Sequence, residues 1–123
     1  MEIYIGLDVH AHSTTAVVVG PTGKRLQQAV IETNREALEA LLRSIEGERH
    51  VCFEEGNASE WLYEVVRPLA TTAVCCQPTK RTGAKSDRRD AERLANALRV
   101  GTIEQPIFKV AGQMTALRAA VRM

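Results

Sequence analysis

The chain has 123 residues, enough for one domain with a single core but too few for two such domains. Its apolar fraction of 45% and charged fraction of 25% are ordinary for a globular protein, and no apolar stretch approaches the ~20 residues that cross a bilayer. A formal net charge of +1 and an aromatic fraction of 4% argue against a strongly basic nucleic-acid wrapper and against a platform of stacked aromatic rings.

The first third of the chain predicts an antiparallel meander of three strands. Residues 3–9 alternate apolar with small or polar side chains, and residues 14–19 form a second apolar run. The quartet Gly20-Pro21-Thr22-Gly23 is a strong turn signal, and a third strand is expected over residues 25–31.

Two helices and two strands are expected to follow in alternation. Thr33 and Glu36 have the capping-box spacing, which predicts a helix that Gly47 closes in the left-handed conformation. Residues 49–53 form a short buried strand that runs into Glu54. A second capping box, Asn57 to Glu60, opens a helix with apolar residues up to Leu69, and residues 72–76 form the fifth strand.

The last third is expected to hold a loop, a long helix and an extended segment. Residues 79–85 contain a single apolar residue and read as a loop, after which Ser86 caps a helix from Asp87 to about Val100 that ends at Gly101. Residues 105–110 read as extended. A final helical pattern begins near Gln113 and stops at the last residue in mid-pattern, so we expect a catalytic domain over 1–111 and the start of a truncated helix, a coiled-coil linker, over 112–123.

This order predicts a mixed α/β sheet with helices on both faces: an antiparallel meander, then alternating helices and parallel strands. Sites in such sheets form at the carboxyl ends of strands near a topological switch. Asp8 ends the first strand and Glu54 the fourth, so the two are expected to be neighbours. Asp87 and Asp90 stand three apart on one helix and share a face.

Each of these acids also has an ordinary structural interpretation. Asp87 suits a helix N-terminus, and Asp90 suits an ion pair with Arg89 or Arg93. The expected convergence of all four acids favours a metal site over these structural interpretations, because gathering four carboxylates without a cation would cost free energy. Mg²⁺ prefers carboxylate oxygens, and two such ions can activate a nucleophile and stabilise a leaving oxygen in phosphoryl transfer. The residues alone therefore predict a centre for two Mg²⁺ or Mn²⁺ ions.

Four segments resemble the N-terminal domain of the DEDD transposases: IGLDVHAHSTTAVVV, CFEEGNASEWLYEVV, CCQPTK and KSDRRDAERLANALRVG. This insertion-sequence family includes the Piv-type DNA invertases, and its catalytic domain is similar to the Holliday-junction resolvase RuvC, with an RNase H-like fold. The most specific match is the K-x-D-x-x-D-A-x-x-L-A pattern at residues 85–95. The resemblance implies a DNA transposase or site-specific recombinase that works in transposition and DNA recombination.

The family's acidic residues fall on Asp8, Asp87 and Asp90, and its glutamate falls on Glu54. The local pattern Glu54-Glu55-Gly56-Asn57 departs from the commoner Glu-Ala-Thr-Gly form, so Glu55 stays open as the alternative ligand.

The resemblance also implies parts and partners beyond these acids. It implies a C-terminal domain that supplies a nucleophilic serine, which this sequence does not contain, so the fragment is expected to be inactive alone. It further implies a structured guide RNA, a homo-oligomer, and DNA contacts from the basic residues around the helix start: Lys80, Arg81, Lys85, Arg88 and Arg89.

Two other functional classes remain open. In an actin-like ATPase lobe, Ser and Thr residues also follow a strand of the Ile-Gly-Leu-Asp type. Such a protein needs a second lobe with a glycine-rich adenosine-binding stretch. A non-catalytic nucleic-acid-binding or assembly module would have its carboxylates pointing apart or neutralised by Arg88, Arg89 or Arg93. A junction-resolving nuclease would share the four acids, and only the C-terminal part would distinguish it.

The remaining candidate ligands are given ordinary roles. His10 and His12 alternate at the mouth of a hairpin and are expected to be exposed loop residues rather than metal ligands. Cys52, Cys75 and Cys76 form no C-x-x-C pair and lack histidines at zinc spacing. An odd number of cysteines without a secretory signal predicts a cytoplasmic protein, with no membrane association.

Overall fold

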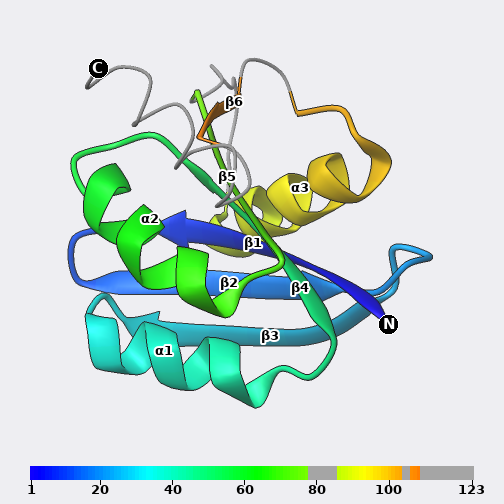
Figure 1. The fold of residues 1–123 in the computed structure, drawn as a ribbon, viewed down its shortest axis with the longest axis horizontal. Coiled ribbons are helices and arrows are strands. Elements are labelled where there is room, and N and C mark those ends of the chain that lie inside the picture. The colour runs from blue at the N-terminus through cyan, green and yellow to red at the C-terminus, as the bar shows by residue number, and fades with distance from the viewer. Residues whose placement is uncertain (78–85, 104–105, 109–123) are drawn as a thin grey trace.

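The computed structural model describes residues 1–77, 86–103 and 106–108, and these form one mixed sheet with helices on both faces (Figure 1). The elements in chain order are β1 (Glu2–Val9), β2 (Ser13–Val19), β3 (Arg25–Glu32), α1 (Arg35–Ser44), β4 (Glu48–Glu54), α2 (Ser59–Val66), the 3₁₀ helix η1 (Arg67–Leu69), β5 (Thr72–Cys76), α3 (Asp87–Val100) and β6 (Pro106–Phe108). The expected loop at 79–85 and the helix expected from Gln113 lie outside the described residues.

The strand order is β3-β2-β1-β4-β5-β6. Strands β1, β2 and β3 form the antiparallel meander, β4 pairs in parallel with β1 and β5 with β4, and β6 is antiparallel to β5. The chain leaves the meander at the end of β3 and crosses through α1 to β4, which pairs with the free edge of β1, so the order of strands reverses between β1 and β4. Leu7 pairs with Phe53, so Asp8 and Glu54 are the next residues on two neighbouring parallel strands. The predicted meander and the predicted neighbours are both confirmed.

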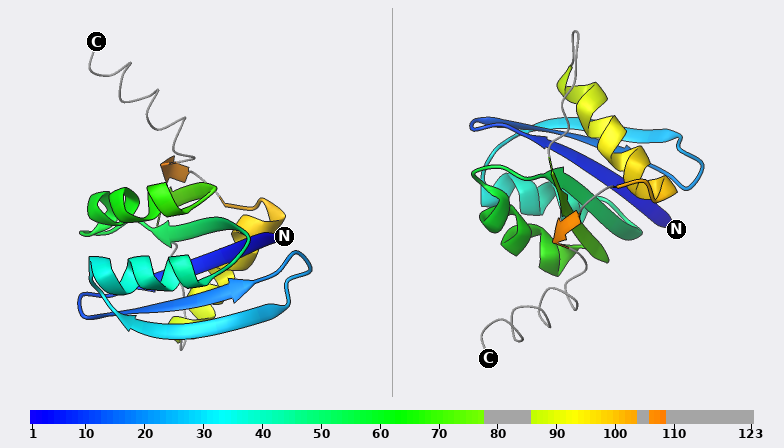
Figure 2. Two further views of the ribbon diagram at one scale, coloured as in Figure 1. Left: turned by 60° about the horizontal axis from the view of Figure 1, so that its bottom comes forward. Right: turned by 90° about the horizontal axis from the view of Figure 1, so that it is seen from above.

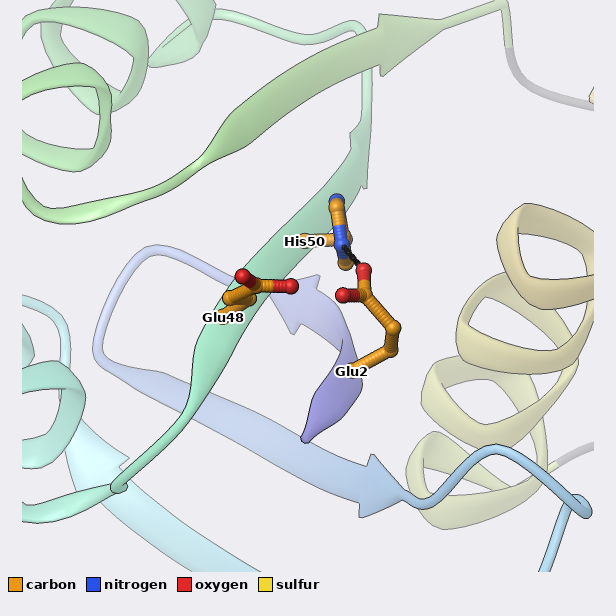
Figure 3. Close-up of side chains that lie close together, drawn as sticks. All are labelled: Glu2, Glu48 and His50. Atoms are coloured by element: carbon orange, nitrogen blue, oxygen red, sulfur yellow. Dashed lines mark hydrogen bonds and ion pairs between the residues drawn. The ribbon is translucent and has the colours of Figure 1, made fainter.

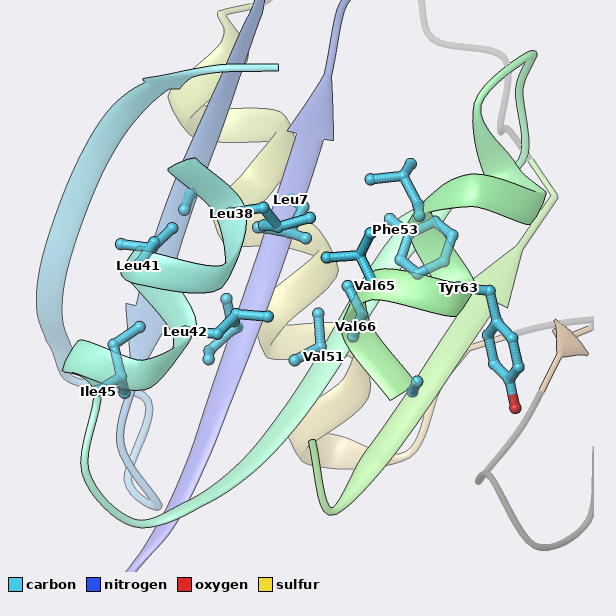
Figure 4. Packing of buried hydrophobic residues seen from close by; sticks show 14 of the residues in the cluster. Leu7, Leu38, Leu41, Leu42, Ile45, Val51, Phe53, Tyr63, Val65 and Val66 are labelled. Atoms are coloured by element: carbon cyan, nitrogen blue, oxygen red, sulfur yellow. The ribbon is translucent and has the colours of Figure 1, made fainter. Parts of the chain in front are cut away.

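Helices α1 and α2 cover one face of the sheet and α3 covers the other, as Figure 2 shows. The larger core lies under α1 and α2. Leu38, Leu42 and Val66 from the helices pack there on Val51 and Phe53 of β4 (Figure 4). All five side chains are buried. Within the described ranges, none of the helices combines the length and the apolar character that a membrane span requires.

Helix α3 lies unusually close to the sheet because β1 carries a glycine beneath it. A Cβ atom at Gly6 would overlap the backbone oxygen of Ala91 and stand 2.8 Å from the backbone nitrogen of Ala95. Ala91 and Ala95 stand one turn apart, and both are fully buried against Val17 and other β2 residues. Small residues on both sides thus set the height of α3 above β1, and with it the position of the acids in its first turn.

The two earlier helices start and stop differently from the sequence prediction. Asn34, not Thr33, caps α1, since its side chain accepts a hydrogen bond of 2.7 Å from the Ala37 amide. Helix α1 ends at Ser44. Gly47 does adopt positive φ, at 115°, but in the turn before β4, where an added Cβ would stand 2.7 Å from the Met1 carbonyl oxygen. Helix α2 begins at Ser59 after an Ala58 N-cap that makes no side-chain bond.

The start and end of α3 match the prediction. The Ser86 hydroxyl accepts a hydrogen bond of 3.2 Å from the Arg89 amide, and Gly101 ends the helix with φ of 78°. These local signals place Asp87 at the first position of the helix, beside the carboxyl end of β1.

Candidate metal centre

Two of the predicted acids meet at the imidazole of His10. Asp8 stands near the end of β1 and Asp87 at the start of α3. The Nε2 atom of His10 lies 3.1 Å from Oδ2 of Asp8 and 3.1 Å from Oδ1 of Asp87. Asp8 is largely enclosed, with 12% of its side chain exposed, whereas His10 and Asp87 are more than half exposed. The fold therefore joins carboxylates from two separate elements at one exposed point.

The charges at this point shift two pKa values. Burial raises the pKa of Asp8, the His10 hydrogen bond opposes that rise, and the nearby Asp87 carboxylate adds to it. Partial burial alone would lower the pKa of His10, but its hydrogen bonds and charge contacts with Asp8 and Asp87 outweigh this effect and raise it. The rise of the His10 pKa, and the part of the Asp8 shift that comes from Asp87, report excess negative charge, which is the condition that attracts a cation.

The turn between β1 and β2 fixes the backbone of His10 at both its amide and its carbonyl. The His10 amide donates to the Ser13 carbonyl oxygen at 2.9 Å, and the Thr33 hydroxyl donates to the His10 carbonyl oxygen at 2.7 Å. Thr33 also bonds to the hydroxyl of buried Thr14 at 2.8 Å. Sequence reasoning expected His10 to be exposed, which is correct, but missed its contacts. The signal available was its place two residues after a strand-end aspartate.

Glu54 lines the same cleft as Asp8 but forms an ion pair with an arginine. The cleft has a volume of about 440 Å³ and is lined by both residues and by Glu55, Asn57 and their neighbours. Oε2 of Glu54 lies 3.0 Å from Nη2 of Arg93 on α3. The Nε atom of Arg93 is buried and has no hydrogen-bond partner among the residues that the structure describes. Cys52 packs against α3, and Glu54 is two residues further along the same strand, so Glu54 lies on the same face of the sheet. The neighbouring Glu55 is exposed.

Asp90 is the most buried of the four predicted acids, with 4% of its surface exposed. It stands one turn after Asp87 on α3. At this end of the sheet, the described ligand atoms that lie within 4.8 Å of one another belong to Asp8, His10 and Asp87. The structure therefore brings Asp8 and Asp87 together, places Glu54 in the same cleft, and keeps Asp90 beneath the helix.

The predicted basic contacts divide into two groups. Arg88 lies 3.7 Å from Glu92, its neighbour one turn later, and Arg89 is exposed on the first turn of α3. Lys80, Arg81 and Lys85 lie outside the described residues.

A second group of potential ligands lies at the opposite end of the same strands (Figure 3). It consists of Glu2, Glu48 and His50, whose ligand atoms also lie within 4.8 Å of one another. Nδ1 of His50 bonds to the Thr72 hydroxyl at 2.8 Å and Nε2 bonds to the Glu2 carboxylate. The ring also stacks on Tyr4, with centroids 5.1 Å apart. Both ring nitrogens are thus already satisfied by protein groups.

The family model for DEDD transposases of the IS110 type, described as "Transposase", matches residues 5–123. The chain belongs to this transposase family. The transposase domain is similar in fold to RuvC of T. thermophilus, solved in complex with a Holliday junction substrate, with a TM-score of 0.57 and 15% identity over 87% of this chain and 100% of that one. No curated protein matches the chain.

The RuvC likeness confirms the predicted RNase H-like fold. The donor atoms at the centre suit the ions expected for it, because Mg²⁺ and Mn²⁺ bind carboxylate oxygens and commonly keep several positions for water or phosphate. Two carboxylates converge at an exposed point beside an open cleft, which leaves such positions accessible. The residues present therefore fit a divalent cation at Asp8 and Asp87.

Proposed function

We propose that this chain is the catalytic domain of a DNA transposase or site-specific recombinase, with Asp8, Glu54, Asp87 and Asp90 holding divalent cations for DNA strand cleavage and transfer. The observation that carries the proposal is the meeting of Asp8 and Asp87, which lie 79 residues apart in the sequence, at one imidazole nitrogen. In a transposase family with a RuvC-like fold, that point lies at the carboxyl edge of the sheet, where sites of this architecture form.

Asp8 and Asp87 would hold the first ion with little movement, since their oxygens already face one nitrogen atom. Glu54 lines the cleft beside Asp8 and would join after exchanging Arg93 for a cation. Asp90, three residues after Asp87, would contribute from the same face of α3. When bound, Mg²⁺ or Mn²⁺, as two ions, would supply charge stabilisation to the phosphate and an activated nucleophile. The protein's own part is to hold the carboxylates in place and to leave the cleft open to the phosphate backbone.

DNA is the proposed substrate. RuvC, the structural neighbour, was solved on a DNA junction, and the first turn of α3 presents Arg88 and Arg89 beside the acids. Lys80, Arg81 and Lys85 are proposed as further phosphate contacts. A guide RNA, a homo-oligomer and a C-terminal domain with a nucleophilic serine follow from family membership as proposals for the complete recombinase.

The test is Mn²⁺ binding by calorimetry, with and without a short DNA duplex, on the wild-type domain and on Asp8→Asn and Asp87→Asn. Glu92→Gln is the matched control, because Glu92 is also a carboxylate on α3 but pairs with Arg25 and Arg88. We expect saturable binding that both aspartate substitutions weaken at least tenfold and the control leaves unchanged. Absence of wild-type binding in both conditions would contradict the metal-dependent function.

One observation favours a second candidate, a nucleic-acid-binding module without catalysis. The Glu54 carboxylate is neutralised by Arg93, as that function predicts. The two candidates differ in the effect of metal on DNA. A catalytic domain binds DNA more tightly with Mg²⁺ or Mn²⁺ than without and loses this metal dependence in Asp8→Asn, whereas a binding module binds DNA with the same affinity with and without metal in both proteins.

A further inference from the structure

We propose that His10 is itself a ligand of the divalent cation through Nε2, and that this nitrogen biases the centre toward Mn²⁺ over Mg²⁺. The inference rests on the proposed metal-dependent function and goes beyond its four acids. It starts from the position of His10 between Asp8 and Asp87, which sequence reasoning treated as an exposed loop residue.

The three donor atoms already have the spacing of ligands on a common ion. Nε2 lies 3.1 Å from one oxygen of each aspartate, and all three ligand atoms lie within 4.8 Å of one another. Adjacent ligands of an octahedral ion with bonds of about 2.1 Å stand about 3 Å apart. A cation can therefore bind beside the three atoms without displacing the imidazole. It takes the place of the proton that Nε2 shares with the two carboxylates, and that proton leaves to solvent while the other ring nitrogen keeps the remaining one.

The backbone of His10 is held in the position that this role requires. Its amide is bonded to Ser13, and its carbonyl is bonded to Thr33, which in turn bonds to buried Thr14. The side chain thus projects from a turn that is tied to β2 and to the segment before α1. A ligand on a fixed turn loses less conformational freedom on binding than one on a free loop.

The other two histidines of the chain lack this arrangement. His50 has both ring nitrogens engaged, by Thr72 and Glu2, and only 15% of its side chain is exposed, against 52% for His10, so a cation has far less access to it. His12 is exposed on the same turn as His10 and belongs to neither of the two described groups of neighbouring ligand atoms. His12 is therefore a matched control, with the same side chain two residues away.

The chemical consequence is a change in metal preference. Mg²⁺ takes oxygen ligands almost exclusively, whereas imidazole nitrogen is a good ligand for first-row transition ions. A centre with Asp8, Asp87 and His10 therefore favours Mn²⁺ over Mg²⁺ more strongly than a centre of carboxylates alone.

Electron spin-echo envelope modulation on the Mn²⁺-loaded domain tests this directly, because it detects nitrogen bonded to the ion. We expect imidazole nitrogen modulation in the wild-type protein, in His12→Ala and in His50→Gln, and its loss in His10→Ala and His10→Gln. Calorimetry should show Mn²⁺ affinity falling about tenfold or more in the His10 variants, a size seen even for partners outside the ligand shell, while Mg²⁺ affinity falls less.

The outcomes separate this inference from the proposed function. Wild-type domain that binds Mn²⁺ in an Asp8-dependent manner but shows no nitrogen modulation would overturn the role of His10 and leave the four-acid centre standing. Wild-type domain that binds no Mn²⁺ would overturn both. Circular dichroism of each variant identifies a folding defect, and the wild-type nitrogen signal decides the question even if the His10 variants fail to fold.

Discussion

The two ends of β1 and β4 carry the same kinds of residue in two different arrangements. At the amino ends, His50 lies between Glu2 and Thr72 within the sheet and stacks on Tyr4. At the carboxyl ends, His10 lies between Asp8 and an aspartate that reaches it from α3. Each group places a histidine and two carboxylates within reach of one another. Only the group at the carboxyl ends receives one of its carboxylates, that of Asp87, from outside the sheet.

This difference shows that residue types alone do not make a metal centre. The imidazole of His50 is satisfied by its neighbours in the sheet and therefore serves stability. The imidazole of His10 faces two carboxylates at an open cleft, where a cation would relieve their repulsion. What separates the two is the docking of α3, for which Gly6 leaves room.

The largest expected effect comes from breaking that docking. Gly6→Ala places a methyl group where the Ala91 backbone oxygen stands, so α3 must move away from the sheet. We expect the free energy of unfolding to fall by about 3 kcal/mol, at the upper end for overpacked sites. Mn²⁺ affinity should fall with it, because Asp87 no longer reaches His10. Urea unfolding and calorimetry measure both quantities.

Gly20→Ala is the matched control for that substitution. Its added Cβ would meet the Leu26 side chain at 3.4 Å, an ordinary contact, so stability should change by less than about 1 kcal/mol. Equal losses in the two variants would show that close approach at Gly6 does not position α3.

The next effect sharpens the comparison between the two histidines. His50→Ala removes the bonds to Thr72 and Glu2 and the stack on Tyr4, which should lower the free energy of unfolding by about 1–2 kcal/mol. It should leave Mn²⁺ affinity within about twofold of wild type. His10→Ala should do the reverse, with a stability change below about 1 kcal/mol because the ring is exposed. A loss of Mn²⁺ binding in His50→Ala would remove the distinction between the two ends.

Local signals in the sequence were sufficient for much of the fold. Ser86 and Gly101 bound α3 because a hydroxyl cap and a left-handed glycine act within one turn of the chain. Thr33 was predicted as the cap of α1 on the same grounds, and this was wrong because its hydroxyl bonds instead to Thr14 and His10. Gly47 adopts the expected positive φ, but it lies in the turn before β4 rather than at the end of α1. It also leaves room for the Met1 carbonyl oxygen, a contact that no local pattern contains.

The site shows the same division. The convergence of Asp8 with Asp87 could be inferred from strand order and helix position, since both depend on topology. The contact of His10 with Asp87 could not, because it depends on the height of α3 above the sheet and on the conformation of the turn that carries His10. Arg93 was weighed as a partner for Asp90, yet the structure pairs it with Glu54 on β4. Side-chain pairing across the sheet and helix interface is decided by packing distance, which spacing along the chain does not encode.

The pair of Arg93 with Glu54 supplies a smaller test at the cleft. Arg93→Ala removes a positive charge beside the centre together with its ion pair to Glu54, so Mn²⁺ affinity should rise about threefold, equivalent to somewhat under 1 kcal/mol. Arg25→Ala is the control, because it removes an exposed pair with Glu92 on the same helix. Calorimetry on both variants decides the matter. Unchanged or weaker binding in Arg93→Ala would show that Arg93 does not compete with the cation for Glu54.

The smallest expected effect concerns Cys75, which is buried in the core under α1 and α2, between the two ends of the strands. Burial is the main cause that raises the pKa of the Cys75 thiol to about 11, from an ordinary 9.0. Above pH 9 the unfolded chain releases this proton while the folded chain keeps it, so the stabilisation is complete below pH 9 and is lost as the pH rises toward 11. Between pH 9 and 10 this amounts to somewhat under ~1 kcal/mol.

Urea unfolding at several pH values, on wild type and on Cys75→Ala, measures that slope. Other groups titrate equally in both proteins, so the difference in slope isolates Cys75, while the constant offset reports the lost side chain. We expect the wild-type free energy of unfolding to fall more steeply above pH 9 than that of the variant. Parallel curves would mean that water reaches Cys75 in the folded protein. The core under α2 would then be accessible to water, as the cleft at the carboxyl ends of the strands is. The contrast between a buried core and an exposed site would then be wrong.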